Sequence, residues 1–160
     1  MFIENDLSIF LNKLDQLKSD TIPNWGSMLP QRMVEHLTDT LRIAIGENKQ
    51  TLVVPEEKLP GMLRFLESDK EMMRNVEVPF AKKDTPLRNE EMELAIDEFA
   101  DAYLDYLEYY ELNPSKTQLH AYYGSLTFEQ WNRLNTKHIT HHFKQFGFFA
   151  FAVLLLIPQP

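Results

Sequence analysis

Cysteine is absent from the 160-residue chain, and this absence excludes several kinds of chemistry at once. Without thiols the protein can form no disulfide, no thiolate metal site, no iron–sulfur cluster and no cysteine nucleophile. Any metal ion held by side chains must therefore be bound by imidazole, carboxylate or carbonyl groups. A domain of this length buries roughly 70% of the surface that its unfolded chain exposes, so it needs no covalent cross-link. We expect a single domain over residues 1–160.

Positive charge is scarce as well, because 16 basic residues stand against 24 acidic ones and the formal net charge is −8. A surface this negative repels phosphate backbones and anionic lipids, so we expect no nucleic-acid partner and no membrane partner. The N-terminal residues 1–6 lack the positive and apolar regions of a secretory signal. These features predict a cytoplasmic protein.

Long apolar runs are also missing, with one exception near the C-terminus. Residues 148–157 (FFAFAVLLLI) carry no charge, but a membrane-spanning helix needs about 20 apolar residues. We therefore expect the apolar C-terminal tail at 148–160 to be covered by protein, either by the rest of the domain or by a second subunit. We predict that it contributes to the contact of a homodimer.

Four segments show the apolar spacing of amphipathic helices, and no segment alternates convincingly with the two-residue period of a strand. The predicted helices occupy about residues 7–17, 28–45, 89–112 and 127–146. Asn5 or Asp6 is placed to cap the first helix, and Thr127 with Gln130 forms a capping box for the last. A long connection with four prolines, in which 61–67 could form a short helix, separates the second and third helices. The pattern predicts an all-α fold, namely a four-helix bundle with a long crossover between the second and third helices.

Five histidines are present, and three of them, His138, His141 and His142, lie close together on the predicted fourth helix. Residues four apart stack on the same face of a helix, so His138 and His142 can direct two imidazoles at one metal ion. At about 100° per residue this pair lies on the apolar side, whereas His141 leans toward polar residues such as Lys137. A third ligand should come from another helix, and His36 borders the apolar stripe of the second.

The predicted ligands of a divalent metal ion are therefore His36, His138 and His142, each as a neutral imidazole. The alternative is that they are hydrogen-bonded core residues, because a bare H-x-x-x-H on a helix is a weak motif. The remaining histidine, His120, lies in a loop before the fourth helix and could reach the mouth of the site.

No protein nucleophile is evident, and the other polar candidates have structural roles in our interpretation. Glu35 points about 100° away from the neighbouring histidine, so we expect it to be a solvated surface residue. We expect Tyr103 and Tyr106 to be core residues with hydrogen-bonded hydroxyls and not catalytic acids. Gln145 lies near His142 on the helical wheel and is placed to orient a ligand or a water.

The stretches that carry these histidines resemble the DinB-like (DinB/YfiT) superfamily, which is described as a group of metal-dependent hydrolases. Asn24–Leu37 (NWGSMLPQRMVEHL) resembles its second helix, and His138–Gly147 (HITHHFKQFG) resembles its H-x-x-H-H-x-x-Q ending. The lead-in His120–Trp131 (HAYYGSLTFEQW) resembles one branch of the superfamily. The likeness spans about residues 5–147, but its specific motifs occupy only the second and fourth helices.

The resemblance implies a four-helix bundle with a long crossover, commonly dimeric, that holds a nickel or zinc ion on three histidines. At the matching positions these ligands are His36, His138 and His142. It also implies hydrolysis of a small-molecule substrate or, as the alternative, a transferase that uses a low-molecular-weight thiol. A third interpretation is a bundle that binds a metal or small ligand without catalysis. The apolar tail after Gly147 departs from the family pattern, which leaves the subunit contact open.

Overall fold

The computed structural model describes residues 1–76, 78 and 84–149. This part of the chain is mostly helical, with five α-helices, one short 3-10 helix and a two-stranded antiparallel sheet. In chain order the elements are α1 (Leu7–Leu14), α2 (Pro30–Ala44), η1 (Glu56–Lys58), α3 (Leu59–Glu67), α4 (Met92–Leu112), β1 (Gln118–His120), β2 (Gly124–Leu126) and α5 (Phe128–Gln145).

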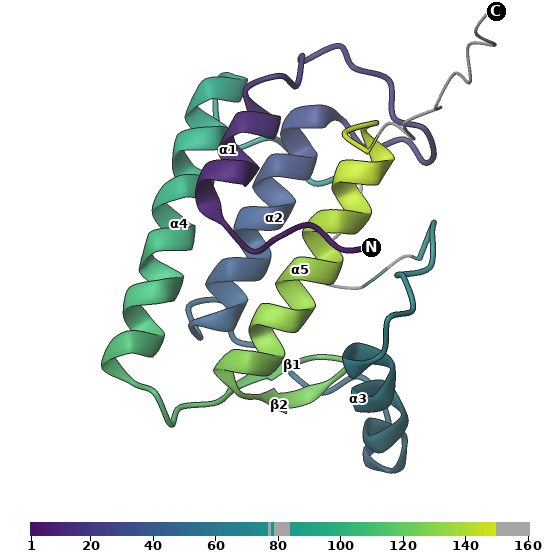
Figure 1. The fold of residues 1–160 in the computed structure, drawn as a ribbon, viewed down its shortest axis with the longest axis vertical. Helices are drawn as coiled ribbons and strands as arrows, with labels where there is room; N and C mark the ends of the chain where they lie inside the picture. Colours follow the sequence, from purple (N-terminus) through teal and green to yellow (C-terminus); the bar gives the residue numbers. More distant parts are fainter. Residues whose placement is uncertain (77, 79–83, 150–160) are drawn as a thin grey trace, which may run out of the picture.

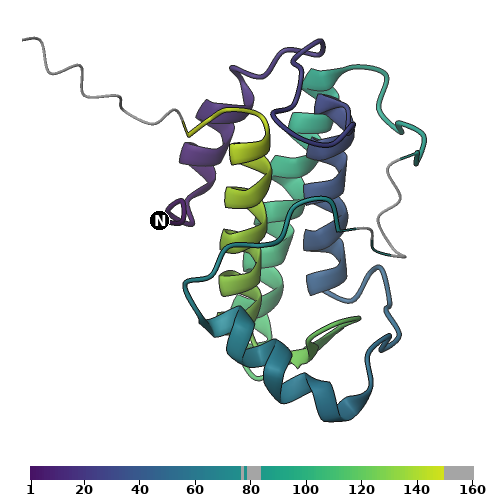
Figure 2. The same ribbon diagram turned by 90° about the vertical axis from the view of Figure 1, so that its right-hand side faces the viewer.

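The helices α2, α4 and α5 run side by side along the molecule, and α1 packs against α4 at one end (Figures 1 and 2). α2 contacts both α4 and α5. The hairpin β1–β2 and α3 lie together at the opposite end from α1 (Figure 1). This arrangement places α2 and α5, the two helices that carry the predicted ligands, next to each other.

The capping residues predicted from the sequence begin their helices as expected. Asp6 accepts hydrogen bonds from the backbone N–H groups of Ser8 and Ile9, at 2.8 and 3.3 Å. Thr127 and Gln130 form the complete capping box at the start of α5. Each cap satisfies N–H groups that have no partner within the helix, so it fixes where the helix begins.

The core between α1, α4 and α5 is rich in aromatic rings. The ring of Phe10 packs edge-on against three others, with centroids 5.6, 6.1 and 6.4 Å away: Tyr103, Phe143 and Phe99. The hydroxyl of Tyr103 donates to Asn5 Oδ1 at 3.2 Å, and that of Tyr106 donates to Asn132 Oδ1 at 2.8 Å. The prediction that both tyrosines are core residues with hydrogen-bonded hydroxyls is confirmed.

The hairpin was not predicted from the sequence, because strands of three residues are too short for a two-residue alternation to show. Its register pairs His120 with Gly124, and Gly124 adopts a φ of 78°, in the left-handed region that favours glycine. His120 was expected in a loop but is the last residue of β1. Since β1 packs against α2, the hairpin brings His120 close to the helix that carries His36.

The expectation that Glu35 is a solvated surface residue is wrong, because its side chain is fully buried. The chain just before α4 lies over it, and the backbone N–H groups of Arg88 and Asn89 donate to Glu35 Oε1 at 3.1 and 3.0 Å. The buried Arg32 forms ion pairs with Glu35 at 3.5 Å and with Asp39 at 2.9 Å. Burial alone would raise the pKa of Glu35, but hydrogen bonds outweigh it, and the pKa is lowered.

Two cations of α5 hold α3 in place. Lys137, expected on a polar face, is only 1% exposed, and its ammonium group donates to the carbonyl oxygens of Phe65 and Lys70 at 3.0 and 2.6 Å. Arg133 donates to the carbonyl oxygens of residues 66–68. Because the last carbonyls of a helix lack intrahelical partners, these contacts fix the end of α3 and the chain that follows it.

Most of the apolar tail predicted at 148–160 lies outside the described residues. Phe148 and Phe149 are partly buried, and the Phe148 ring packs edge-on against Phe143 with centroids 5.2 Å apart. The homodimer contact through this tail stays a prediction. Among the helices that the structure describes, none combines the length and the apolar character needed to cross a membrane.

Candidate metal centre

Three histidines from two neighbouring helices meet at one point. α2 carries His36, and α5 carries His138 and His142 one turn apart. The Nε2 atom of His138 lies 2.8 Å from Nε2 of His36 and 3.1 Å from Nε2 of His142. The potential ligand nitrogens of the three all lie within 4.8 Å of one another. The structure thus brings together the three residues that the sequence analysis named.

These distances fit nitrogen ligands of one divalent ion. Zinc–nitrogen bonds are about 2.0–2.1 Å long, so two ligand nitrogens lie about 2.9 Å apart at a right angle and about 3.4 Å apart at the tetrahedral angle. Of the two measured separations, 2.8 Å lies just below this range and 3.1 Å lies within it. The cluster found among the described residues contains imidazoles only, a ligand type that suits zinc and nickel.

Gln145 fixes which nitrogen of His142 carries the proton. Its Oε1 lies 2.8 Å from Nδ1 of His142, and its Nε2 donates to the carbonyl oxygen of Trp25 at 3.0 Å. The bond to Trp25 sets the orientation of the amide, so Nδ1 of His142 must donate to Gln145. Nε2 of His142 therefore presents a lone pair to the cluster, as a metal ligand does. The expected orienting role of Gln145 fits this geometry.

Hydrogen bonds alone satisfy the three converging nitrogens poorly. Nε2 of His138 can carry one proton, yet it lies within hydrogen-bond distance of Nε2 of both His36 and His142. A single proton on Nε2 of His138 can form one well-aligned hydrogen bond, either to His36 or to His142. The remaining nitrogen–nitrogen contact then has no well-aligned hydrogen bond. A cation between the rings would satisfy all three lone pairs. The geometry therefore favours a metal site over hydrogen-bonded core histidines.

Burial keeps these imidazoles neutral, which is the form that binds a metal. Burial, together with the positive charge of Arg32, lowers the pKa of His36 from 6.5 to about 4. Burial also lowers the pKa of His138 and of His142 well below the usual value, and the neighbouring histidines add to the shift.

Acid should destabilise the metal-free protein. His36 has a folded-state pKa of about 4 and an unfolded-state value near 6.5, so between these pH values the unfolded chain binds more protons. Stability is therefore lost as pH falls from about 6.5 toward 4, and His36 alone contributes a loss of about 3 kcal/mol. Urea unfolding at a series of pH values measures this. A free energy of unfolding that stays constant from about pH 7 to 5 would contradict the burial of neutral histidines in the cluster. His36→Asn should make the pH dependence less steep, and the other buried histidines should account for what remains.

The contact between Gln145 and the loop before α2 was not predicted. Gly26 in this loop adopts a φ of 73°, and a Cβ on it would lie 3.2 Å from Nε2 of Gln145. A side chain at this position would be strained and would crowd the amide that orients His142. The glycine after Trp25 is the only signal in the sequence, and it does not say which residue approaches it.

Removing the amide of Gln145 should weaken metal binding without abolishing it. We expect Gln145→Ala to lower the affinity for zinc about 10- to 100-fold, because loss of a partner that orients a histidine ligand has effects of this size. Competition with a chromophoric chelator measures the affinity. Gln16→Ala is the matched control, because Gln16 is exposed and bonds only within its own helix region. Equal affinity in the two variants would remove Gln145 from the site.

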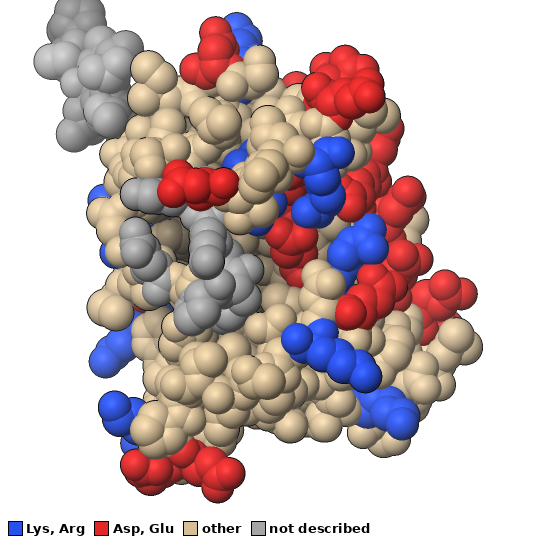
Figure 3. Space-filling model, turned by 180° about the vertical axis from the view of Figure 1, so that it is seen from behind, with Lys and Arg blue, Asp and Glu red and all other residues tan. Residues whose placement is uncertain are grey.

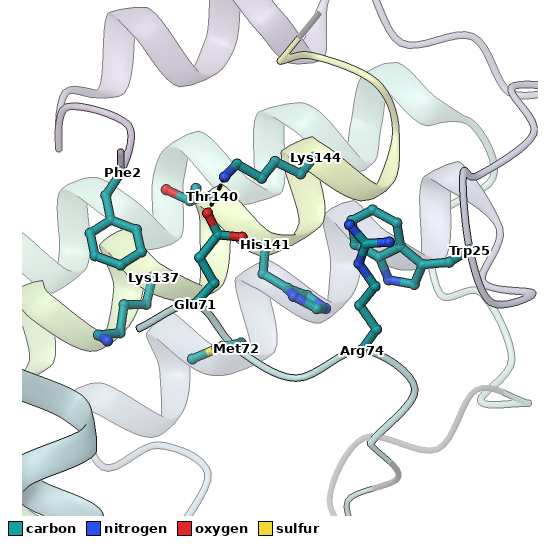
Figure 4. A pocket seen from close by; sticks show the side chains of 9 residues that line it. All are labelled: Phe2, Trp25, Glu71, Met72, Arg74, Lys137, Thr140, His141 and Lys144. Carbon is teal, nitrogen blue, oxygen red and sulfur yellow. Dashed lines mark hydrogen bonds and ion pairs between the residues drawn. The ribbon is translucent and has the colours of Figure 1, made fainter. Parts of the chain in front are cut away.

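His141 lies outside the cluster, as predicted. Its ring packs edge-on against Trp25 with centroids 5.5 Å apart. Figure 4 shows it in a small pocket, where Arg74 stacks on Trp25 and Lys144 pairs with Glu71. His141 thus belongs to the outer wall of the site and not to the ligand set.

A cavity of about 1150 Å³ adjoins the cluster, and all five histidines line it. His120 reaches it from the end of β1, so the expectation that it lies near the mouth of the site is consistent with its position. Nδ1 of His120 accepts a hydrogen bond from the backbone N–H of Tyr122 at 3.1 Å, which places the ring proton on Nε2. Burial lowers the pKa of His120 to about 4, so it is neutral at ordinary pH.

Comparison of the chain with family models, with curated proteins and with solved structures found no match. The case for a functional site therefore depends on the geometry of the three histidines and on the cavity beside them. What the geometry defines is a mostly helical protein with a buried three-histidine cluster that could hold a metal ion. Membership of the DinB-like superfamily stays a prediction from the sequence.

Proposed function

We propose that the protein is a metal-dependent hydrolase of the DinB-like kind, built on a four-helix bundle of α1, α2, α4 and α5. His36, His138 and His142 would hold a divalent ion, nickel or zinc, through their Nε2 atoms. The observation that carries this proposal is the convergence of three neutral imidazole nitrogens, one of them with its lone pair fixed by Gln145. When bound, such an ion supplies Lewis acidity, which polarises a carbonyl or a thiol and makes water a better nucleophile.

The residues of the chain provide the surroundings that this chemistry needs. Three neutral ligands leave the full positive charge of the ion in place, since no carboxylate belongs to the cluster found among the described residues. The cavity gives a small-molecule substrate access to the cluster. His120, with its proton on Nε2, is a neutral hydrogen-bond donor in the same cavity.

The size of the cavity is compatible with the alternative function, transfer to a low-molecular-weight thiol. Pockets for one drug-sized ligand are usually about 300–1,000 Å³, and this cavity is about 1150 Å³. It therefore has room for a thiol beside a second substrate. A purely structural metal site is disfavoured, because structural sites are closed whereas these histidines line an open cavity.

Metal analysis of protein purified without a nickel column tests the proposal. We expect close to one zinc or nickel ion per chain by mass spectrometry of the acid-digested protein. Ester and amide panels, run with and without added thiols, then separate hydrolase from transferase. Protein that binds less than about a tenth of an equivalent after dialysis against zinc or nickel would contradict the metal site.

A further inference from the structure

The described residues that line the cavity beside the histidines include almost no ionised groups. Of the 22 described residues that line it, Asp84 is the only one with a carboxylate, and none carries an ammonium or guanidinium group. Charged residues make up 25% of the chain, so 22 residues taken at random would include five or six. On the back face, acidic side chains gather along the α4 edge, while uncharged ones cover the lower middle (Figure 3). The described part of the cavity wall is thus nearly uncharged on an acidic protein.

Methionine provides much of the apolar wall. Four of the seven methionines line the cavity, and they come from different parts of the chain: Met28, Met62, Met72 and Met73. Met28 precedes α2, Met62 lies on α3, and the other two follow α3. Methionine is unbranched and polarisable, so a wall built from it adapts to apolar groups of different shapes.

The three clustered histidines and Gln145 are also part of the cavity wall. Building on the metal-dependent function proposed above, we propose that the substrate is an uncharged amphiphile. Its single polar group, a carbonyl or a thiol, lies at the histidines, and its apolar body fills the methionine-lined cavity. Apart from the proposed ion itself, the described lining residues offer no cation that could pair with a phosphate or with a second carboxylate, so we expect phosphorylated and polycarboxylate compounds to bind weakly.

Two cations of the neighbouring outer pocket do not change this conclusion. Arg74 and Lys144 line the small outer pocket of Figure 4 and not the cavity. Arg74 is stacked on Trp25, with 4.0 Å between its guanidinium carbon and the ring centroid, and Lys144 is paired with Glu71. Both cations therefore have partners in the protein already.

A pair of hydroxamates that share one metal-binding group tests the proposal on the zinc-loaded full chain. Titration calorimetry should show octanohydroxamic acid binding at least tenfold tighter than acetohydroxamic acid. Each buried methylene strengthens binding by about fourfold, and the longer probe has six more of them. A ratio below about threefold, with zinc bound, would overturn the proposal.

A second measurement needs no metal, so it separates the cavity from the metal site. With ¹³C-labelled methionine methyl groups, 1-octanol should shift the signals of the cavity methionines and leave that of the core residue Met92 in place. If the protein fails to bind zinc but octanol still shifts the methionine signals, the metal-dependent function is overturned. The cavity would then remain a binding site for an amphiphile. Methyl signals that octanol does not move would overturn the amphiphile site itself.

Substitution of methionines in the cavity wall, compared with an exposed leucine elsewhere, tests whether the cavity binds the apolar chain. Met62→Gln and Met28→Gln keep the length of the side chain but add an amide, and both positions are only partly buried, so the fold should tolerate them. Each should reduce the octanohydroxamate preference by about threefold or more and leave acetohydroxamate binding within twofold. Leu112→Gln, at an exposed position at the end of α4, should change neither. An unchanged preference in both methionine variants would count against the cavity as the binding site.

Discussion

Replacing His138 by alanine is expected to reduce bound zinc to less than about a tenth of an equivalent. His138 is the central ligand, because its Nε2 lies within 3.1 Å of Nε2 of both His36 and His142. Its loss leaves two ligand nitrogens on different helices, which is too few for a zinc site. Metal content after dialysis, measured by mass spectrometry, checks the result. His36→Ala and His142→Ala should lower the content in the same way.

Two controls show that the loss is local. His141→Ala should keep nearly the full metal content, because this ring packs against Trp25 outside the cluster. The circular dichroism spectrum and the metal-free melting temperature of His138→Ala should remain close to those of the parent, since no buried ion pair is broken. Undiminished zinc in His138→Ala, or equal losses in His138→Ala and His141→Ala, would show that the metal is held elsewhere.

Much of the helical framework could be predicted because its signals are local. Apolar periodicity and capping residues located four of the five α-helices of the described chain, with boundaries that differ by a few residues. The short helix expected at 61–67 is α3, which begins two residues earlier. The first helix was predicted to reach residue 17 but ends at Leu14, although Leu17 is buried all the same. The apolar spacing of a helix therefore predicts buried residues correctly even where the chain has already left the helix.

The site was predictable where one helix sets the geometry. His138 and His142 share a face of α5 by their spacing alone, and Gln145 follows from the same wheel. His36 required the further assumption that the second and fourth helices are neighbours, which they are. The carbonyl of Trp25 could not be predicted, because a backbone group in a loop has no sequence signature.

The wrong expectations concern contacts made by the irregular connection between α2 and α4. A helical wheel places Glu35 and Lys137 on polar faces, and it assumes that a polar face meets water. In the structure, residues 65–70 lie on Lys137 and residues 88–89 lie on Glu35. The sequence pattern of α3 and of the irregular chain around it does not say which face of a neighbouring helix they cover, so these two burials could not be predicted.

Buried hydrogen bonds of Glu35 join the chain just before α4 to α2. Its Oε1 accepts from the backbone N–H groups of Arg88 and Asn89 and lies 3.4 Å from Nε2 of Gln31. Its Oε2 faces Arg32, whose side chain is only 4% exposed. The guanidinium of Arg88 continues the network to Asp39 and Glu98, at 2.7 and 2.9 Å.

We expect Glu35→Ala to lower the free energy of unfolding by about 3–5 kcal/mol, the usual cost of removing one partner of a buried ion pair. The change leaves two backbone N–H groups without their acceptor and Arg32 with Asp39 as its remaining partner. Urea unfolding at neutral pH measures the loss, and Glu35→Gln, which keeps an acceptor oxygen, should lose less. Glu108→Ala, at an exposed position on α4, is the matched control and should stay within about 0.5 kcal/mol of the parent. A Glu35→Ala protein as stable as this control would mean that the chain before α4 does not lie on α2.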